Sequence, residues 1–248
     1  MGLVLLLITI FIVTIINDKK QVLEEKTSAH RALLRNSFQL AMYDTQKGLN
    51  ALACKISSNQ AIVDAFERGD RQKLFELTQP YFQEAKSRGE ADLAGFIGAN
   101  GIHFLRMQDP KRYGDNLTDK RPMLANALKT RQPQSALDVT IYRVALVTIL
   151  PIFKGDRFIG VIQTSADIDR VQKRLNMHSG IKSAIAFDTV KLKTLLEEPG
   201  IIRYQGYTLV SSNDILFEHL PKNFTFKQSN RYDIDNRTYI IASRVLND

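Results

Sequence analysis

The chain opens with an uninterrupted apolar run. Residues 1–16 read MGLVLLLITIFIVTII and carry no charged side chain. As a helix this run would span about 24 Å, which is short against a membrane hydrocarbon core of about 30 Å. No basic residues precede it and no small-residue cleavage site follows it, so the pattern favours an uncleaved membrane anchor over a signal peptide. The alternative is a buried helix of a soluble core, although no other segment is apolar enough to surround such a helix.

A long helical pattern follows the apolar run. From residue 22 to residue 57 the chain is rich in Ala, Leu, Lys and Glu, with Gly48 as its one glycine. Apolar positions recur there at steps of three and four, which places them on one face of a helix. The pattern therefore predicts a stalk helix of about 50 Å. The shared face comprises Leu34, Phe38, Ala41, Thr45, Leu49, Leu52 and Ile56.

Beyond the stalk the hydrophobic period changes from helical to extended. The run Ser57–Ser58–Asn59 offers N-caps for one helix before the change, and Asp70 is suited to cap the next. After Asp92, short apolar runs indicate strands, and Asn100–Gly101 is a strong hairpin turn. The expected elements are helices over 61–68, from Asp70 to Gly89 and over 122–129, and strands over 93–98, 102–107, 136–142, 144–153 and 157–165. Their order predicts one antiparallel sheet with helices on one side.

A second, shorter cycle of elements follows a connecting helix expected over 167–175. It comprises strands over 183–187, 207–211, 229–234 and 237–245 and helices over 190–197 and 214–220. We therefore predict an α+β fold in which a long helix precedes two antiparallel-sheet modules of similar build. The predicted divisions are an anchor at 1–17, a stalk at 18–58, a membrane-distal module at 59–168 and a membrane-proximal module at 169–248.

Composition removes several classes of function. Lys and Arg number 34 against 26 Asp and Glu, which gives a net charge of +8 and favours anionic partners. The basic residues are spread along the chain and are not interleaved with aromatic residues, so nucleic-acid binding is not expected. Four histidines without HExxH spacing and a single cysteine give no dedicated metal site. No nucleophile motif or nucleotide-binding motif indicates an enzyme or a cofactor.

Charged residues gather in and around one irregular loop after the first hairpin. Arg106, Asp115 and Arg121 lie within 16 residues of one another. Because guanidinium groups hold carboxylates through paired hydrogen bonds, one interpretation is a cationic lobe for an acidic or amino-acid-like ligand. Asp115 or Asp167 would then take an ammonium group. The other interpretation is an Arg–Asp pair that fixes the loop to the neighbouring helix.

Four single residues have both a functional and an ordinary interpretation. Tyr113 and Tyr142 could line a pocket with an aromatic face and a hydroxyl group, or could be ordinary packing residues. His103 alternates with an apolar neighbour on a strand, so we expect a surface or core residue and not a ligand. Cys54 lies near the apolar face of the stalk. We expect it to be a buried, inert thiol, with an intermolecular disulfide as the second possibility.

The stretch after the hairpin carries a specific order of short motifs. They are FLRM at 104–107, DP at 109–110, YGDNL at 113–117, RP at 121–122, Asn126, Pro151–Ile152 and FIG at 158–160. This order resembles the double Cache family, whose members are PAS-like extracytoplasmic sensor domains of bacterial chemoreceptors, sensor kinases and diguanylate cyclases. The resemblance is strongest from Ala94 to Asp167 and extends more loosely over most of residues 20–248.

The resemblance implies a receptor region outside the cytoplasmic membrane that binds a small molecule in its distal module. It further implies a membrane attachment and a homodimer formed through the stalk helix, with no cofactor and no catalytic activity. A membrane-anchored protein-interaction module without a small-molecule ligand is the alternative. The residues expected to bind ligand are Arg106, Tyr113, Asp115, Arg121, Asp138, Tyr142 and Asp167.

Several positions depart from the family pattern. The family usually has a His on the first strand, where this chain has Gly95 and its neighbours, and a Glu where Asp138 stands. It usually has an Arg near Val147 and a Glu near Gln163. If these positions face the pocket, we expect this protein to bind a different ligand from its more highly charged relatives, or to bind less selectively.

Overall fold

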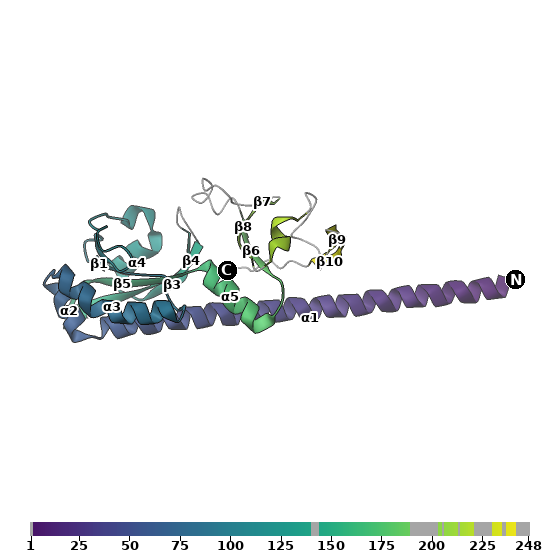
Figure 1. The fold of residues 1–248 in the computed structure, drawn as a ribbon, viewed down its shortest axis with the longest axis horizontal. Helices are drawn as coiled ribbons and strands as arrows, with labels where there is room; N and C mark the ends of the chain where they lie inside the picture. The colour runs from purple at the N-terminus through teal and green to yellow at the C-terminus, as the bar shows by residue number, and fades with distance from the viewer. Residues whose placement is uncertain are drawn as a thin grey trace.

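One helix runs along the whole molecule (Figure 1). The computed structural model describes residues 2–139, 144–188, 203–204, 206–212, 214–220, 230–234 and 237–241. Helix α1 (Gly2–Ser57) is continuous over 56 residues, so the apolar start and the stalk form a single helix. Among the residues that the structure describes, no helix combines the length and the hydropathy needed to cross a membrane. The anchor at 1–17 therefore stays a prediction.

The buried face of α1 is the one that its hydrophobic period predicts. Ala41, Thr45, Leu49 and Ile56 are fully buried, and Leu52 is nearly so. The two residues of the face nearest the N-terminus, Leu34 and Phe38, are partly buried against a second apolar cluster. The prediction for Cys54 is wrong, because this side chain is exposed. Each helix position is rotated by about 100° from the one before it, and Cys54 falls outside the buried stripe.

Two short helices complete the layer that α1 begins. Helix α2 (Gln60–Glu67) begins after Asn59, whose side chain accepts hydrogen bonds from the next turn. Helix α3 (Arg71–Ser87) begins after Asp70, which accepts a hydrogen bond in the same way. Asp70 is thus confirmed as an N-cap, and of the three candidates at 57–59 the structure selects Asn59. Each side chain satisfies backbone donors that have no intrahelical partner.

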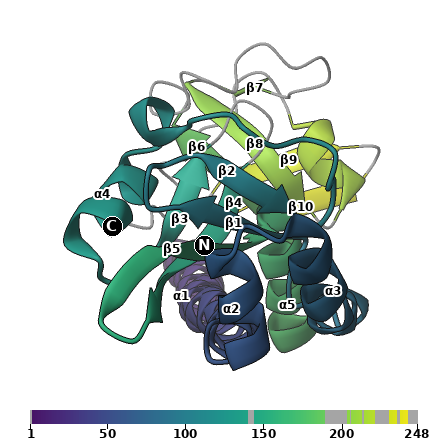
Figure 2. The same cartoon turned by 90° about the vertical axis from the view of Figure 1, so that its left-hand side faces the viewer.

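The helices cover a five-stranded antiparallel sheet (Figure 2). Its strands are β1 (Leu93–Gly98), β2 (His103–Arg106), β3 (Gln134–Val139), β4 (Val144–Lys154) and β5 (Arg157–Asp167). The spatial order is β2-β1-β5-β4-β3, which places β2 and β3 at the two edges. The predicted hairpin at Asn100–Gly101 is confirmed, because it joins β1 to β2, and a second turn at Gly155 joins β4 to β5.

Both faces of this sheet carry apolar residues, and each face has its own cover. Phe96, Leu105 and Ile162 pack with α1, α2 and α3 on one face. Ile97 and Val147 pack on the other face against helix α4 (Pro122–Thr130), which follows the short η1 (Thr118–Lys120). The prediction of helices on one side is therefore wrong for α4. Successive strand residues point to opposite faces, so two apolar faces require two covers.

The remainder of the described chain forms a second set of strands beside α1. Helix α5 (Ile168–Ser179) follows β5 directly and packs on α1. The described elements beyond it are β6 (Ala184–Asp188), β7 (Arg203–Tyr204), β8 (Tyr207–Ser212), η2 (Ile215–Glu218), β9 (Asn230–Ile234) and β10 (Arg237–Ile241). They make one three-stranded sheet, β6-β8-β7, and one hairpin, β10-β9. The fold is α+β as predicted, and the helix expected over 190–197 lies outside the described residues.

Candidate functional site

The first polar cluster is centred on Arg106, the last residue of β2. Its two terminal nitrogens donate to both carboxylate oxygens of Asp115, at 2.8 and 2.7 Å. One of them also donates to the backbone carbonyl of Arg112 at 2.8 Å. The Arg106 side chain is 9% exposed, so the charge is held inside the protein and paired through the bidentate geometry that guanidinium and carboxylate favour. The Arg106 guanidinium lowers the pKa of Asp115 to about 2, mainly through its hydrogen bonds.

His103 completes this cluster from the same strand. Its Nδ1 lies 3.2 Å from the terminal nitrogen Nη2 of Arg106. Because a guanidinium can only donate, Nδ1 accepts this hydrogen bond and the ring proton belongs on Nε2. Burial, followed by the charge of Arg106, lowers the pKa of His103 to about 4. The imidazole is therefore neutral at physiological pH.

The ring of His103 also explains the glycine on the neighbouring strand. A Cβ atom at Gly95 would lie 3.1 Å from Nε2 of His103 and 2.9 Å from the carbonyl oxygen of Leu105. Any side chain at this position would therefore collide with β2. The imidazole of β2 occupies the space that a side chain on the first strand would need.

A second polar cluster joins the start of α4 to the sheet. Arg121 donates to one carboxylate oxygen of Asp138 through Nε at 3.1 Å and through Nη2 at 2.6 Å. Its Nη1 donates to the side-chain oxygen of Gln163 at 2.8 Å. The Arg121 and Asp138 side chains are 13% and 16% exposed. The other two N–H groups of Arg121 have no acceptor among the described residues.

The sheet register brings the two clusters onto the same face. Gly95 pairs with Arg106 on one side and with Gln163 on the other, so these three positions form a row across β2, β1 and β5. Residues opposite one another in a ladder point to the same face. Arg121 also contributes to the lowered pKa of His103, which shows that the clusters lie within electrostatic range of each other. A polar strip thus crosses the face that α4 covers.

The other two predicted residues that the structure describes, Tyr113 and Asp167, make further contacts of their own. Tyr113 lies with its ring 3.5 Å from the guanidinium carbon of Arg71, on the side of the helix layer. Asp167 stands at the N-cap of α5, and its backbone N–H donates to Asp92 at 2.9 Å. Tyr142 lies outside the described residues. Of the predicted set, Arg106 with Asp115 and Arg121 with Asp138 are brought together.

Sequence reasoning missed two residues of the site region. His103 was expected to be an ordinary sheet residue, but it contacts the buried Arg106. Arg71 lies 33 positions before Phe104, whose backbone carbonyl it binds, and nothing in the local pattern around α3 indicates that contact. Strict alternation would place His103 and Arg106 on opposite faces of β2, and the irregular register between β1 and β2 brings them to the same face.

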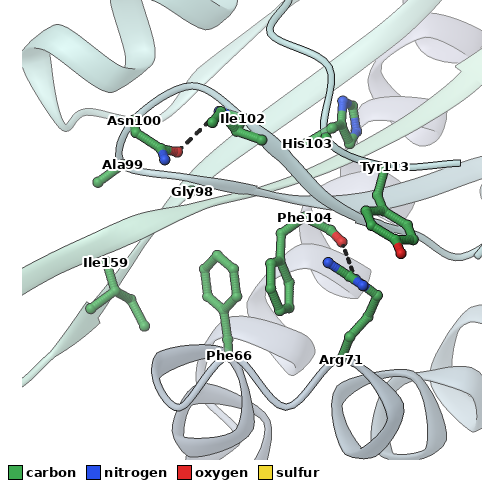
Figure 3. Close-up of a pocket in the computed structure, with 11 residues that line it drawn as sticks. Phe66, Arg71, Gly98, Ala99, Asn100, Ile102, His103, Phe104, Tyr113 and Ile159 are labelled. Atoms are coloured by element: carbon green, nitrogen blue, oxygen red, sulfur yellow. Dashed lines mark hydrogen bonds between the residues drawn. The ribbon is translucent and has the colours of Figure 1, made fainter.

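A cavity of about 410 Å³ opens beside the hairpin that joins β1 to β2 (Figure 3). Its walls come from the end of α2, the start of α3, strand β2 and the loop at 113–114. Phe66, Phe104, Tyr113 and Arg71 line it. It lies beside the Arg106 cluster, and His103 belongs to both.

Comparisons with known proteins agree with this architecture. Residues 23–248 match the family described as the double sensory domain of two-component sensor kinases. The sensor domain of the V. cholerae histidine kinase DctB aligns with a TM-score of 0.50 and 15% identity, over 66% of this chain and 64% of that one. The extracellular domain described as that of a histidine kinase, vpHK1S-Z8, aligns with a TM-score of 0.51 and 12% identity, over 67% and 68%.

A third structure, the sensor domain of E. coli DcuS, aligns with a TM-score of 0.46 and 16% identity, over 55% of this chain and 98% of that one. At these identities the two matches with TM-scores of 0.50 and 0.51 establish the fold and nothing finer. A search of curated proteins found no match.

Proposed function

We propose, because this chain belongs to the double sensory domain family of two-component sensor kinases, that it is the small-molecule-sensing region of a transmembrane receptor. The family consists of sensor domains and not of enzymes, so recognition of a ligand and not turnover is the activity to explain. In this proposal the first residues of α1 anchor the chain, and the sensor region lies in the periplasm or outside the cell. The five-stranded module binds the ligand.

The observation that carries the proposal is the polar strip on the α4-covered face. Two guanidinium groups and a neutral imidazole lie among apolar residues such as Ile97 and Val147. Burial of charged groups in an apolar layer is costly unless they are paired. Buried ionisable groups with perturbed pKa values are found often at functional sites. The two N–H groups of Arg121 that have no acceptor within the described part of the chain suit a ligand acceptor, and a carboxylate offers the matching pair of oxygens. We therefore propose an acid or an amino acid as ligand.

A short path connects the strip to the long helix. Gln163 faces Arg121, and the next residue, Thr164, points to the opposite face of β5. The hydroxyl of Thr164 donates to the backbone carbonyl of Leu49 in α1 at 3.1 Å. A ligand that competes for Arg121 would change the hydrogen bonding of Gln163. Because Gln163 and Thr164 are neighbours on β5, a displacement of this strand would be passed to its contact with α1. It can bias the receptor only by its difference in affinity between the two states.

The test uses the full chain in a mild detergent and a panel of dicarboxylates, monocarboxylates and amino acids. We expect at least one acid to raise the unfolding temperature in a saturable way, and Arg121→Gln to abolish the shift. Arg157→Gln is the matched control. Arg157 is an exposed arginine at the first position of β5, and it is paired with Glu67 at the end of α2. An undiminished shift in Arg121→Gln, or no shift with any acid or amino acid, would contradict the proposal.

One observation favours a second candidate function. Arg106 and Arg121 are each paired with a carboxylate of the same chain, as in a purely structural ion pair. The domain would then be a membrane-anchored interaction module without a small-molecule ligand. In that case Arg121→Gln would lower stability, and no compound in the panel would bind.

The same proposal includes a homodimer through α1. Three exposed apolar residues lie on the face of α1 opposite its buried face: Leu33, Leu40 and Tyr43. A second copy of α1 packed on them would remove that surface from water. Light scattering of the purified chain measures the mass directly, and Leu40→Glu is expected to shift a dimer toward the monomer.

A further inference from the structure

The cavity beside the β1–β2 hairpin is lined by an arginine whose surroundings are unusual. The guanidinium carbon of Arg71 lies 3.5 Å from the ring centre of Tyr113 and 4.9 Å from that of Phe104. Its Nε donates to the carbonyl oxygen of Phe104 at 2.9 Å, as Figure 3 shows. The side chain is thus held in one place by two aromatic rings and one hydrogen bond.

Within the described part of the chain, the charge of Arg71 is not matched by an acid. Arg106, Arg121 and Arg170 each bind a carboxylate of this chain. Among the described residues no carboxylate lies within ion-pair distance of Arg71, and its Nη groups have no hydrogen-bond acceptor. Arg71 is only half-buried, and it lines an open cavity with these N–H groups available.

We propose that this cavity is a second ligand site, which takes a small organic carboxylate with a flat apolar body. The Nη edge of Arg71 would bind the carboxylate in a bidentate manner. Phe66 and Phe104, whose ring centres are 5.5 Å apart, offer the apolar wall for the rest of the molecule. The volume of about 410 Å³ lies within the range of about 300–1,000 Å³ typical of small-molecule pockets.

The loop that bounds the cavity also serves the Arg106 cluster. Tyr113 stacks on Arg71, and Asp115, two positions later, binds Arg106. The backbone of the same loop pairs with β2, because Gly114 N–H donates to the carbonyl of His103 at 2.8 Å. An occupant of the cavity would therefore stabilise the loop conformation in which Asp115 reaches Arg106. The site is defined without reference to the strip on the other face, so it does not depend on the function proposed above.

The test is ligand-observed NMR and calorimetry on the full chain in detergent, with benzoate as the probe and benzamide as its uncharged analogue. We expect saturable binding of benzoate and at least about tenfold weaker binding of benzamide, because a hydrogen bond to a charged partner is the stronger kind. We expect Arg71→Gln to weaken benzoate by about tenfold or more. Arg68→Gln, an equal loss of charge at the exposed end of α2, should leave binding unchanged.

Two results would overturn the proposal. One comes from the unaltered chain, so it does not require any variant to fold. It is either no saturable binding of benzoate or equal binding of benzoate and benzamide. The other is benzoate binding that survives in a folded Arg71→Gln protein. Benzoate binding that is lost in Arg121→Gln and kept in Arg71→Gln would assign the probe to the α4-covered face, and would refute the cavity site while supporting the function proposed above.

Discussion

His103 is expected to make the stability of the fold depend on pH in a mildly acidic window. Its pKa falls from 6.5 to about 4 on folding, because burial and the charge of Arg106 both disfavour the protonated ring. The unfolded chain therefore binds this proton more tightly than the folded chain between those two values. The contribution of His103 to stability is fully present above pH 6.5 and is lost as the pH falls toward about 4.

The magnitude follows from the two pKa values. A difference of 6.5 minus 4, or about 2.5 units, corresponds to about 3 kcal/mol at 1.36 kcal/mol per unit. About 2 kcal/mol of this is lost by about pH 5. The ring is only 7% exposed, so solvent screens the effect little. Asp115 acts in the same direction but in a lower window, because its pKa is lowered from 3.8 to about 2 and its contribution is lost only below pH 3.8.

Urea unfolding at several pH values measures this effect. His103→Gln is the suitable variant, because glutamine keeps a hydrogen-bond acceptor for Arg106 and does not titrate. Between about pH 7.5 and pH 5 we expect the unaltered chain to lose about 2 kcal/mol more than the variant does. Parallel pH profiles for the two proteins would refute the reasoning, since they would assign the acid sensitivity to other groups.

Three further substitutions test the packing and the pairing in the five-stranded module. Asp115→Asn leaves Arg106 charged and without its partner. Because Asp115 is partly exposed, we expect the free energy of unfolding in denaturant to fall by about 1–3 kcal/mol. The same substitution in an Arg106→Leu background should cause a smaller loss. Phe96→Ala empties a fully buried position and should cost about 3–5 kcal/mol in the same assay, with a smaller loss refuting tight packing there. Gly160→Ala should fail to give folded protein, because a Cβ there would lie 2.3 Å from the carbonyl oxygen of Ile97 at a φ of +148° that favours glycine; normal thermal unfolding of this variant would contradict the strand geometry.

Local features of the fold were predictable because each depends on residues close in the chain. The buried face of α1 follows from its spacing of three and four, and the capping roles of Asn59 and Asp70 follow from their short polar side chains. The hairpin at Asn100–Gly101 is also local. The error on Cys54 shows the limit of this reasoning, since one residue step around a helix separates a buried position from an exposed one.

The chemistry of the site was visible in the sequence as residue types, and its pairings were not. Arg106, Asp115, Arg121 and Asp138 are all ionisable residues near one loop, and either arginine could have served either acid. The choice is made by the sheet, which brings β3 and β5 to Arg121 and leaves Asp115 to Arg106.

The sequence by itself determined the long helix, the order of helices and strands from α2 to β6 apart from the short η1, and the residue types available for recognition. These features follow from the local hydrophobic period. Only the tertiary structure decided that α4 covers the second face and that the ring of His103 lies over Gly95. It alone also placed Arg71 against Tyr113. These outcomes depend on strand register and on contacts between distant segments. A shift of β2 by one residue would move the ring of His103 to the opposite face of the sheet.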